Sequence, residues 1–240
     1  MRSHVPTVLI TGANRGIGLE HARAYAAQGW RVLACARDPA RSQALVELQR
    51  SYPEQIEPMA LDVTDHAAVD ALASELNDET IDVLLNNAGT FGPQGFPDGM
   101  AYQGLEQMDY EIWRQILEVN LLSPFKVAVA FHDHLARAER PLLVMMTSDL
   151  GSIAQNTQGK SYAYRTSKAG LNMVTRGIAQ EWPDIIVIAM APGWCKTDLG
   201  GDIAHIETKD SVREQQRTFA RVTLEESGRV LDRFGAVVAW

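Results

Sequence analysis

Short apolar runs alternate with stretches of helical periodicity along most of the chain. The runs expected to form strands are residues 7–11, 31–36, 58–61, 81–86, 142–147 and 185–190. Helices are expected at 17–28, 41–51, 65–76, 109–121 and 124–137, with another that carries Tyr164 and continues to about residue 182. This alternation predicts βαβ units, and continuously apolar strands are typical of a parallel sheet covered on both faces. We therefore expect a doubly wound α/β fold with a mostly parallel sheet.

Composition limits the classes of function. The 240 residues are 46% hydrophobic, which suits a single domain spanning residues 1–240. A net charge of −8 and a pI near 5.3 argue against nucleic-acid or anionic-membrane binding and favour a small-molecule partner. There is no apolar run of transmembrane length and no leader signal in residues 1–6. The two cysteines, Cys35 and Cys195, are expected to be free thiols. These features predict a cytoplasmic protein.

A glycine-rich turn follows the first expected strand. Residues 11–18 read Thr-Gly-Ala-Asn-Arg-Gly-Ile-Gly, and a helix begins near Gly16. Glycine allows a tight turn and a close approach to a phosphate, while a helix N-terminus presents unpaired N–H groups. The turn predicts a pyrophosphate site, although its spacing differs from the G-x-G-x-x-G fingerprint and a glycine cluster can also serve only as a turn.

Two tyrosines and a lysine lie close together in the segment "SYAYRTSK", residues 161–168. Side chains four residues apart share one face of a helix. Tyr164 has Lys168 at that spacing, whereas Tyr162 has Thr166. The spacing nominates Tyr164 for chemistry, although such a pair on its own more often serves packing.

Several short motifs, taken together and in their order along the chain, resemble those of a known family. Thr-Gly-x-x-x-Gly-Ile-Gly is followed by Asn86-Asn87-Ala88-Gly89, Asn120, Ser148, Tyr164-x-x-x-Lys168 and Ala191-Pro192-Gly193. In this order, over nearly the whole chain, they resemble the short-chain dehydrogenase/reductase family. Longer strings such as "LITGANRGIGLE" and "APGWCKTDLGG" look like the branch that contains sniffer-type carbonyl reductases and the signalling protein C-factor. The resemblance implies a Rossmann-type fold, with a cofactor half at about 1–120 and a substrate and catalytic half at about 121–240.

The resemblance also implies a mechanism, which is hydride transfer between nicotinamide and a carbonyl or alcohol carbon. Tyr164 would exchange the oxygen-bound proton. Lys168, helped by the positive charge of the oxidised nicotinamide, would lower the pKa of that phenol, and it would also bind the nicotinamide ribose. Ser148, with Thr147 as its rival, would hold the substrate oxygen. Asn120 would maintain a water-linked proton path, or would simply cap a helix turn. Tyr162 is expected to be a wall or packing residue.

The cofactor expected from the resemblance is NADP(H) in preference to NAD(H). Family members specific for NAD commonly have an acid at the end of the second strand that binds the adenosine ribose hydroxyls, and this chain has no acid there. Arg37 follows the strand instead, and Arg37 and Arg15 of the glycine-rich turn could both bind the 2′-phosphate of NADP(H). Asp38 would point to solvent or pair with Arg41. The full set of expected cofactor contacts is Gly12, Asn14, Arg15, Gly16, Ile17, Gly18, Arg37, Asp62, Val63, Asn87, Ala88, Gly89, Tyr164, Lys168, Pro192, Gly193 and Thr197.

Two long irregular segments, residues 90–108 and 192–210, follow expected strands and would wall a substrate pocket. Residues 194–210 are expected to act as a mobile lid. The serine-to-tyrosine gap is longer than in common relatives, so residues within 151–159 should reshape the pocket mouth. The aromatic and methionine side chains of these segments either line the pocket or pack beneath the loops: Phe91, Phe96, Met100, Tyr102 and Trp194. Cys195 is expected to be inert, and the histidines show no zinc spacing, so no metal is predicted.

The leading interpretation is an NADPH-dependent carbonyl reductase or alcohol dehydrogenase with a small-molecule substrate. The alternative is a cofactor-binding signalling protein of C-factor type with little turnover, and an isomerase or dehydratase on the same scaffold is a third option. Intact Ser148, Tyr164, Lys168 and Asn120 favour the enzyme, because a sensor needs only the cofactor site. The substrate, the reaction direction and homo-oligomer formation stay open.

Overall fold

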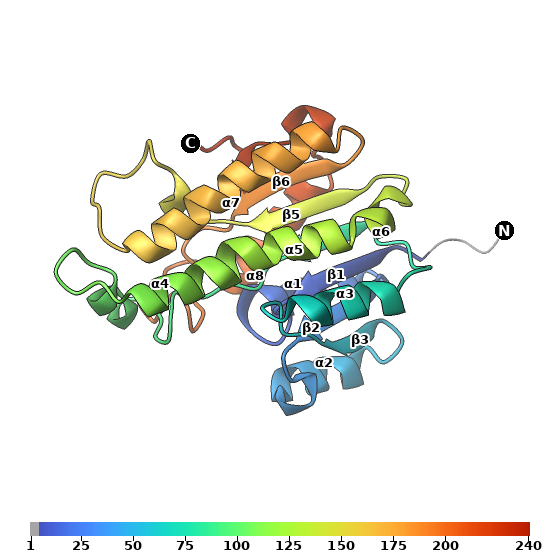
Figure 1. Cartoon of the computed structure of the whole chain (residues 1–240). Helices are drawn as coiled ribbons and strands as arrows, with labels where there is room; N and C mark the ends of the chain where they lie inside the picture. The colour runs from blue at the N-terminus through green and yellow to red at the C-terminus, as the bar shows by residue number, and fades with distance from the viewer. Residues whose placement is uncertain (1–4) are drawn as a thin grey trace.

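Seven strands form one sheet in which every neighbouring pair is parallel (Figure 1). The computed structural model describes residues 5–240. The strands are β1 (Thr7–Thr11), β2 (Arg31–Ala36), β3 (Ile56–Ala60), β4 (Val83–Asn86), β5 (Leu142–Met146), β6 (Ile186–Ala191) and β7 (Val230–Asp232). Their order is β3-β2-β1-β4-β5-β6-β7, so the winding direction reverses between β1 and β4. Ligands of open α/β sheets bind beyond the carboxyl ends of the strands at such a reversal.

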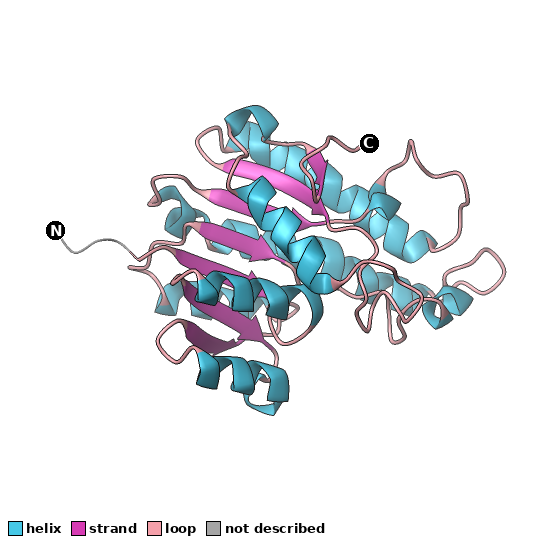
Figure 2. Cartoon of the chain, turned by 180° about the vertical axis from the view of Figure 1, so that it is seen from behind, coloured by secondary structure: helices cyan, strands magenta, loops and turns pink. Residues whose placement is uncertain are grey.

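Helices cover both faces of the sheet (Figures 1 and 2). One face carries α1 (Gly16–Ala27), α2 (Gln43–Ser51) and α8 (Thr208–Phe219). The other carries α3 (His66–Glu75), α5 (Ser123–Ala130), α6 (His132–Ala136) and α7 (Tyr162–Glu181), with α4 (Tyr110–Leu117) packed against α7. The expected doubly wound α/β fold is confirmed, and the sheet of the described residues is parallel throughout.

Each central strand sends alternate side chains to the two faces. In β1, Val8 and Ile10 join the core beneath α1, whereas Leu9 joins the core beneath α3 and α5. All three are fully buried. Because both faces are covered, the strand is apolar at every position, which explains the uninterrupted runs in the sequence.

Several boundaries differ from the predictions. Strand β3 begins two residues earlier than expected, at Ile56, and tolerates Pro58 because it lies at the sheet edge. The expected helix at 124–137 breaks at Phe131 into α5 and α6. Helix α8 and strand β7 were not predicted. Of the residues in which no leader signal was expected, 1–4 lie outside the described part of the chain. No helix in residues 5–240 combines the length and apolar character needed to cross a membrane.

Candidate active site

The glycine-rich turn joins β1 to α1 at the carboxyl edge of the sheet, beside the end of β4. Thr11 holds the two strand ends together, because its hydroxyl oxygen accepts hydrogen bonds from the backbone N–H groups of Asn87 and Ala88, each at 3.0 Å. The Asn87 side-chain amide donates to the carbonyls of Thr11 and Gly12 at 2.9 and 3.2 Å. The expected cofactor residues Asn87 and Ala88 therefore also lock the turn in place.

Glycine is required at particular positions of this turn. A Cβ on Gly18 would lie 2.3 Å from the Gly12 carbonyl oxygen and 2.4 Å from Asn87 Nδ2, and Gly16 has φ +55°. Arg15, which precedes α1, makes no side-chain cap on the helix. A glycine cradle at an uncapped helix N-terminus fits a dinucleotide pyrophosphate, because its N–H groups can donate to phosphate oxygens.

Tyr164 and Lys168 lie together on the inner face of α7. Their exposed fractions are 7% and 4%, and Lys168 Nζ lies 5.7 Å from the centre of the Tyr164 ring. The ammonium group donates a hydrogen bond of 2.8 Å to the carbonyl of Met146, at the end of β5. Tyr162 is only half-buried, and its helix neighbour Thr166 bonds the Trp113 indole of α4. The structure therefore brings together the pair expected from the spacing and places Tyr162 away from it.

The expected lowering of the Tyr164 pKa does not occur in the protein alone. Burial raises the pKa of Tyr164 to about 12, a hydrogen bond with the Ser148 side chain opposes this shift, and the Asp149 carboxylate adds to it. Burial also lowers the pKa of Lys168 to about 7. Burial disfavours the charged form of each group, and in the protein alone the positive charge of the oxidised nicotinamide, which the prediction included, is not there to oppose it. At neutral pH, Tyr164 is therefore the protonated phenol.

Ser148 follows β5 and is partly exposed, so its hydroxyl is accessible beside Tyr164. Its oxygen accepts a hydrogen bond from the backbone N–H of Leu150 at 3.2 Å, which fixes the short turn after the strand. The rival Thr147 is 2% exposed, and its hydroxyl donates to Asn172 Oδ1 at 2.7 Å. Thr147 therefore joins β5 to α7 within the core, and of the two hydroxyls Ser148 has the accessible one.

Asn120 lies in a widened, π-helical turn, Glu118–Leu122, that joins α4 to α5. Its side chain is fully buried and bonds both the N–H and the carbonyl of Thr90, each at 2.8 Å, and donates to Ser167 Oγ at 3.0 Å. A Cβ on Gly89 would lie 3.4 Å from Asn120 Oδ1 and 3.7 Å from Lys168 Nζ. Asn120 therefore ties the segment after β4 to α7 within a short distance of the lysine. Single π turns of this kind occur frequently at functional sites.

The expected adenosine end of the site lies after β2. The Arg37 side chain is exposed there and makes no ion pair or hydrogen bond with the described residues. Asp38 pairs with Arg41 at 3.1 Å, which is one of the two arrangements expected for it. Arg15 pairs at 2.7 Å with Asp198 of the segment after β6, and both side chains are largely exposed. Asp62 and Val63 follow β3, partly buried, with Asp62 accepting from the Thr64 backbone N–H and hydroxyl.

The remaining expected cofactor residues also meet at this edge. Asn14 is partly buried in the turn, and its carbonyl accepts from the Ser42 hydroxyl at 3.0 Å, while Ile17 packs against the core. Pro192 and Gly193 follow β6, and Gly193 has φ +78°. The Thr197 methyl would lie 3.2 Å from a Cβ on Gly16, so the segment after β6 covers the glycine-rich turn.

A row of aromatic rings links the catalytic helix to both irregular segments. The Phe91 ring lies 4.9 Å from the Tyr164 ring, Phe96 lies 6.2 Å from Phe91, and Trp194 lies 5.2 Å from Phe96, all between ring centres. Phe91 is buried, whereas Trp194 is 38% exposed. Phe91 therefore packs beneath the loops, whereas Trp194 is exposed at the outer end of the row, and pocket lining stays a prediction.

Two residues of the site were missed by the sequence reasoning. Asp149 directly follows Ser148, and its pKa is raised by burial and by the nearby Asp232. Gln103 is fully buried and bonds the backbone of Tyr164. No periodicity or motif marks either residue, because one is an acid in a turn and the other an amide in an irregular loop.

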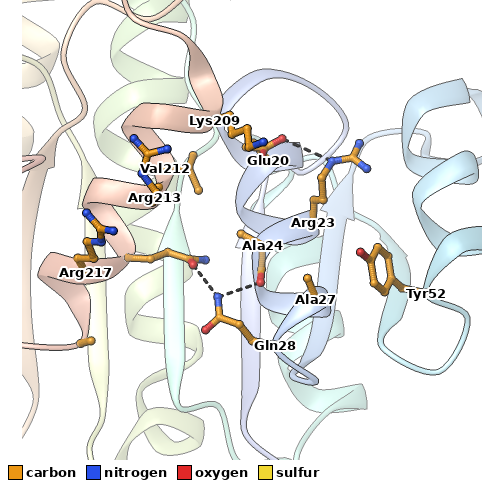
Figure 3. A pocket seen from close by; sticks show the side chains of 12 residues that line it. Glu20, Arg23, Ala24, Ala27, Gln28, Tyr52, Lys209, Val212, Arg213 and Arg217 are labelled. Carbon is orange, nitrogen blue, oxygen red and sulfur yellow. Dashed lines mark hydrogen bonds and ion pairs between the residues drawn. The ribbon is translucent and has the colours of Figure 1, made fainter.

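Other features lie outside this site. A groove of about 540 Å³ runs between α1 and α8 on the opposite face of the sheet from α7, with Arg23, Lys209, Arg213 and Arg217 along its sides (Figure 3). No group of His, Cys, Asp or Glu side chains within residues 5–240 is arranged to hold a metal ion. Both cysteines are buried free thiols, and burial raises the pKa of each.

Fold and site together define the class of protein: a Rossmann-type α/β protein with a dinucleotide cradle and a buried tyrosine and lysine beside it. Comparison with known proteins gives the family. The sequence model of the short chain dehydrogenases matches residues 6–207. The C-signal of Myxococcus xanthus is 35% identical over 172 residues, covering 71% of this chain and 99% of that protein.

Solved structures agree with this match. The carbonyl reductase Sniffer of D. melanogaster superimposes with a TM-score of 0.89 at 27% identity, and the NADPH-bound carbonyl reductase from chicken fatty liver with 0.88 at 29%. Each comparison covers 99% of this chain and 100% of the other. The chain belongs to the short-chain dehydrogenase family. Members of this family are oxidoreductases that bind a nicotinamide dinucleotide and a small-molecule substrate.

Proposed function

We propose that this protein is an NADP(H)-dependent reductase that converts a small-molecule carbonyl to an alcohol. The observation that carries the proposal is the burial of Tyr164 and Lys168 on one face of α7, next to Ser148 at the carboxyl edge of the sheet. When bound, the nicotinamide group supplies or accepts the hydride. The chain's own residues then have to orient the substrate oxygen and move one proton.

Tyr164 is the proton donor in this scheme. Burial keeps its phenol protonated at neutral pH, and that is the form which carbonyl reduction consumes. The Ser148 side chain lies close enough to the phenol to lower its pKa, so a substrate oxygen held by Ser148 would be within reach of the Tyr164 proton. The Phe91 ring packs against the Tyr164 ring and limits the access of water from that side.

Lys168 and Asn120 form the inner end of the site. Lys168 donates to the Met146 carbonyl and keeps its remaining N–H groups for a ribose hydroxyl or a water. Its neighbour Asn120 holds the segment after β4 by two hydrogen bonds to Thr90. We propose that Lys168 passes a proton toward Tyr164 after each turnover and regains one from water, and that Asn120 maintains the water-linked path to the lysine.

The charged side chains that follow β2 support a preference for NADP(H). Arg37 stands exposed after β2, where no carboxylate opposes a 2′-phosphate, and Asp38 is occupied by Arg41. Among similar structures, the chicken liver carbonyl reductase is described as bound to NADPH at 29% identity. We propose cofactor contacts at the residues named from the sequence, with residues 1–120 as the cofactor half and 121–240 as the substrate and catalytic half.

A second candidate is a signalling protein with little turnover, because the C-signal is 35% identical over 71% of this chain. One screen separates the two. Aldehydes, ketones and quinones are each added to the protein with NADPH, and the loss of reduced cofactor is followed by absorbance. Turnover that Tyr164→Phe abolishes supports the reductase. Tight NADPH binding with no turnover of any compound contradicts it and favours the signalling protein.

A further inference from the structure

Gln103 lies in the irregular segment between β4 and α4, yet its side chain is fully buried. Its amide oxygen accepts a hydrogen bond of 2.9 Å from the backbone N–H of Tyr164. Its amide nitrogen donates to the carbonyls of Phe91 at 2.8 Å and Gly99 at 3.1 Å. One side chain thus joins the catalytic helix to the loop that packs against it.

Helix α7 depends on this outside partner. Ser161, which precedes the helix, adopts a left-handed conformation and makes no side-chain cap. The first N–H groups of a helix have no partner within the helix, and a buried one without a partner is costly. Gln103 serves two of them, since its backbone carbonyl also accepts from the Tyr162 N–H at 3.2 Å. The N-terminal turn that carries Tyr164 is therefore fixed by a residue distant in sequence.

The amide nitrogen of Gln103 acts on Phe91, the residue that packs against the Tyr164 ring. By holding the Phe91 carbonyl, Gln103 fixes the residue whose ring lies 4.9 Å from the Tyr164 ring. The backbone of Tyr164 and the wall against its ring are thus set by one planar group. A displacement of about 1 Å at a catalytic group can reduce the rate by a factor of about 100.

We propose that Gln103 is a positioning residue for Tyr164, acting as a clamp that fixes both the backbone and the ring of the proton donor. This inference rests on the proposed function, because it assigns Tyr164 to proton transfer. Gln103 touches neither the glycine-rich turn nor Arg37, so its action falls on the chemical step and leaves cofactor binding intact.

The test compares two buried glutamines. Gln215 on α8 is also fully buried and bonds His21 and Ser211, so it matches Gln103 in burial and chemistry but lies away from Tyr164. Gln103→Met should lower kcat by about 10- to 100-fold while KM for NADPH changes less than about twofold. Gln215→Met should lower the melting temperature similarly and leave kcat within about twofold. A Gln103→Met enzyme that loses stability but keeps kcat overturns the proposal.

Gln103→Glu gives the conservative comparison. It keeps an oxygen acceptor for the Tyr164 N–H and loses the donors to Phe91 and Gly99, so kcat should lie between wild type and Gln103→Met. If Gln103→Met does not fold, a Gln103→Glu enzyme with kcat equal to wild type overturns the proposal. Amide exchange of residues 162–165 supplies a readout without turnover, and it should accelerate in Gln103→Met but not in Gln215→Met. Inactive wild-type protein would refute the proposed function, whereas unchanged exchange would refute the clamp.

Discussion

Arg37 should account for most of the preference for NADPH over NADH. Its guanidinium is exposed and bonds none of the described residues, so binding a phosphate breaks no existing contact. A hydrogen bond to a charged group contributes about 1.5–3 kcal/mol, and screening at an exposed site favours the lower end of that range. About 1.5 kcal/mol corresponds to a factor of about ten. Arg37→Ala should therefore reduce the ratio of kcat/KM for NADPH to kcat/KM for NADH by about tenfold.

Arg15 should contribute less, because its guanidinium already pairs with Asp198 at 2.7 Å. An exposed pair of this kind is worth about 0.2–1 kcal/mol, and Arg15 must share or exchange it to reach a phosphate. Arg15→Ala should therefore change the ratio by about two- to fivefold. Asp198→Asn should have the opposite effect, because it releases Arg15 and removes a negative charge near the phosphate.

The assay measures kcat/KM with each cofactor at one fixed ionic strength for wild type, the three single variants and the double variant that combines Arg37→Ala with Arg15→Ala. Raising the ionic strength should narrow the wild-type preference, since the contacts are exposed. A preference for NADH, or an NADPH preference that survives the combined Arg37→Ala and Arg15→Ala changes, refutes the reasoning. An Asp198→Asn enzyme with lower NADPH preference would refute the part that concerns Arg15.

Three further outcomes are expected. Lys168→Met should raise the melting temperature below pH 7, because a buried ammonium destabilises the folded wild type. This gain in melting temperature should shrink as the pH rises from about 7 toward the ordinary lysine pKa of 10.5. A difference in melting temperature that stays constant with pH would contradict this expectation. Amide exchange in residues 194–207 should slow when NADPH and substrate bind, whereas equal exchange with and without them counts against a lid. Ser148→Ala should lower kcat by about 10- to 100-fold, whereas Thr147→Val should lower thermal stability with less effect on kcat. A large loss of kcat in Thr147→Val with little loss in Ser148→Ala would instead favour Thr147 as the site hydroxyl.

The fold was predictable because its signal is repeated along the chain. Strands buried on both faces are apolar at every position, and β1 and β2 appear at the bounds expected from their runs. Helix α8 gave no such signal, because its buried face is built from Ser211, Gln215 and Thr218 as well as Val212 and Phe219. Strand β7 has only three residues and depends on its neighbour β6 for pairing.

The candidate site was predictable only in part, because residue spacing shows which side chains share a helix face but not how deeply they are buried. The four-residue spacing placed Tyr164 and Lys168 on one face of α7, and the structure shows both buried there. The raised pKa of Tyr164 in the protein alone was not predicted, because spacing reveals a nearby cation but not the depth of burial. Gln103 is invisible to spacing, since its partner lies in an element far along the chain.

The central claim, that Tyr164 is the proton donor of a carbonyl reductase, is tested most directly by comparing two single-atom deletions. Tyr164→Phe and Tyr162→Phe each remove one hydroxyl and keep the ring, and NADPH oxidation is measured with the best carbonyl compound found for the wild type. Tyr164→Phe should lose nearly all turnover while its Kd for NADPH stays within about twofold, and Tyr162→Phe should keep most of its activity. An active Tyr164→Phe enzyme together with an inactive Tyr162→Phe enzyme would contradict the account.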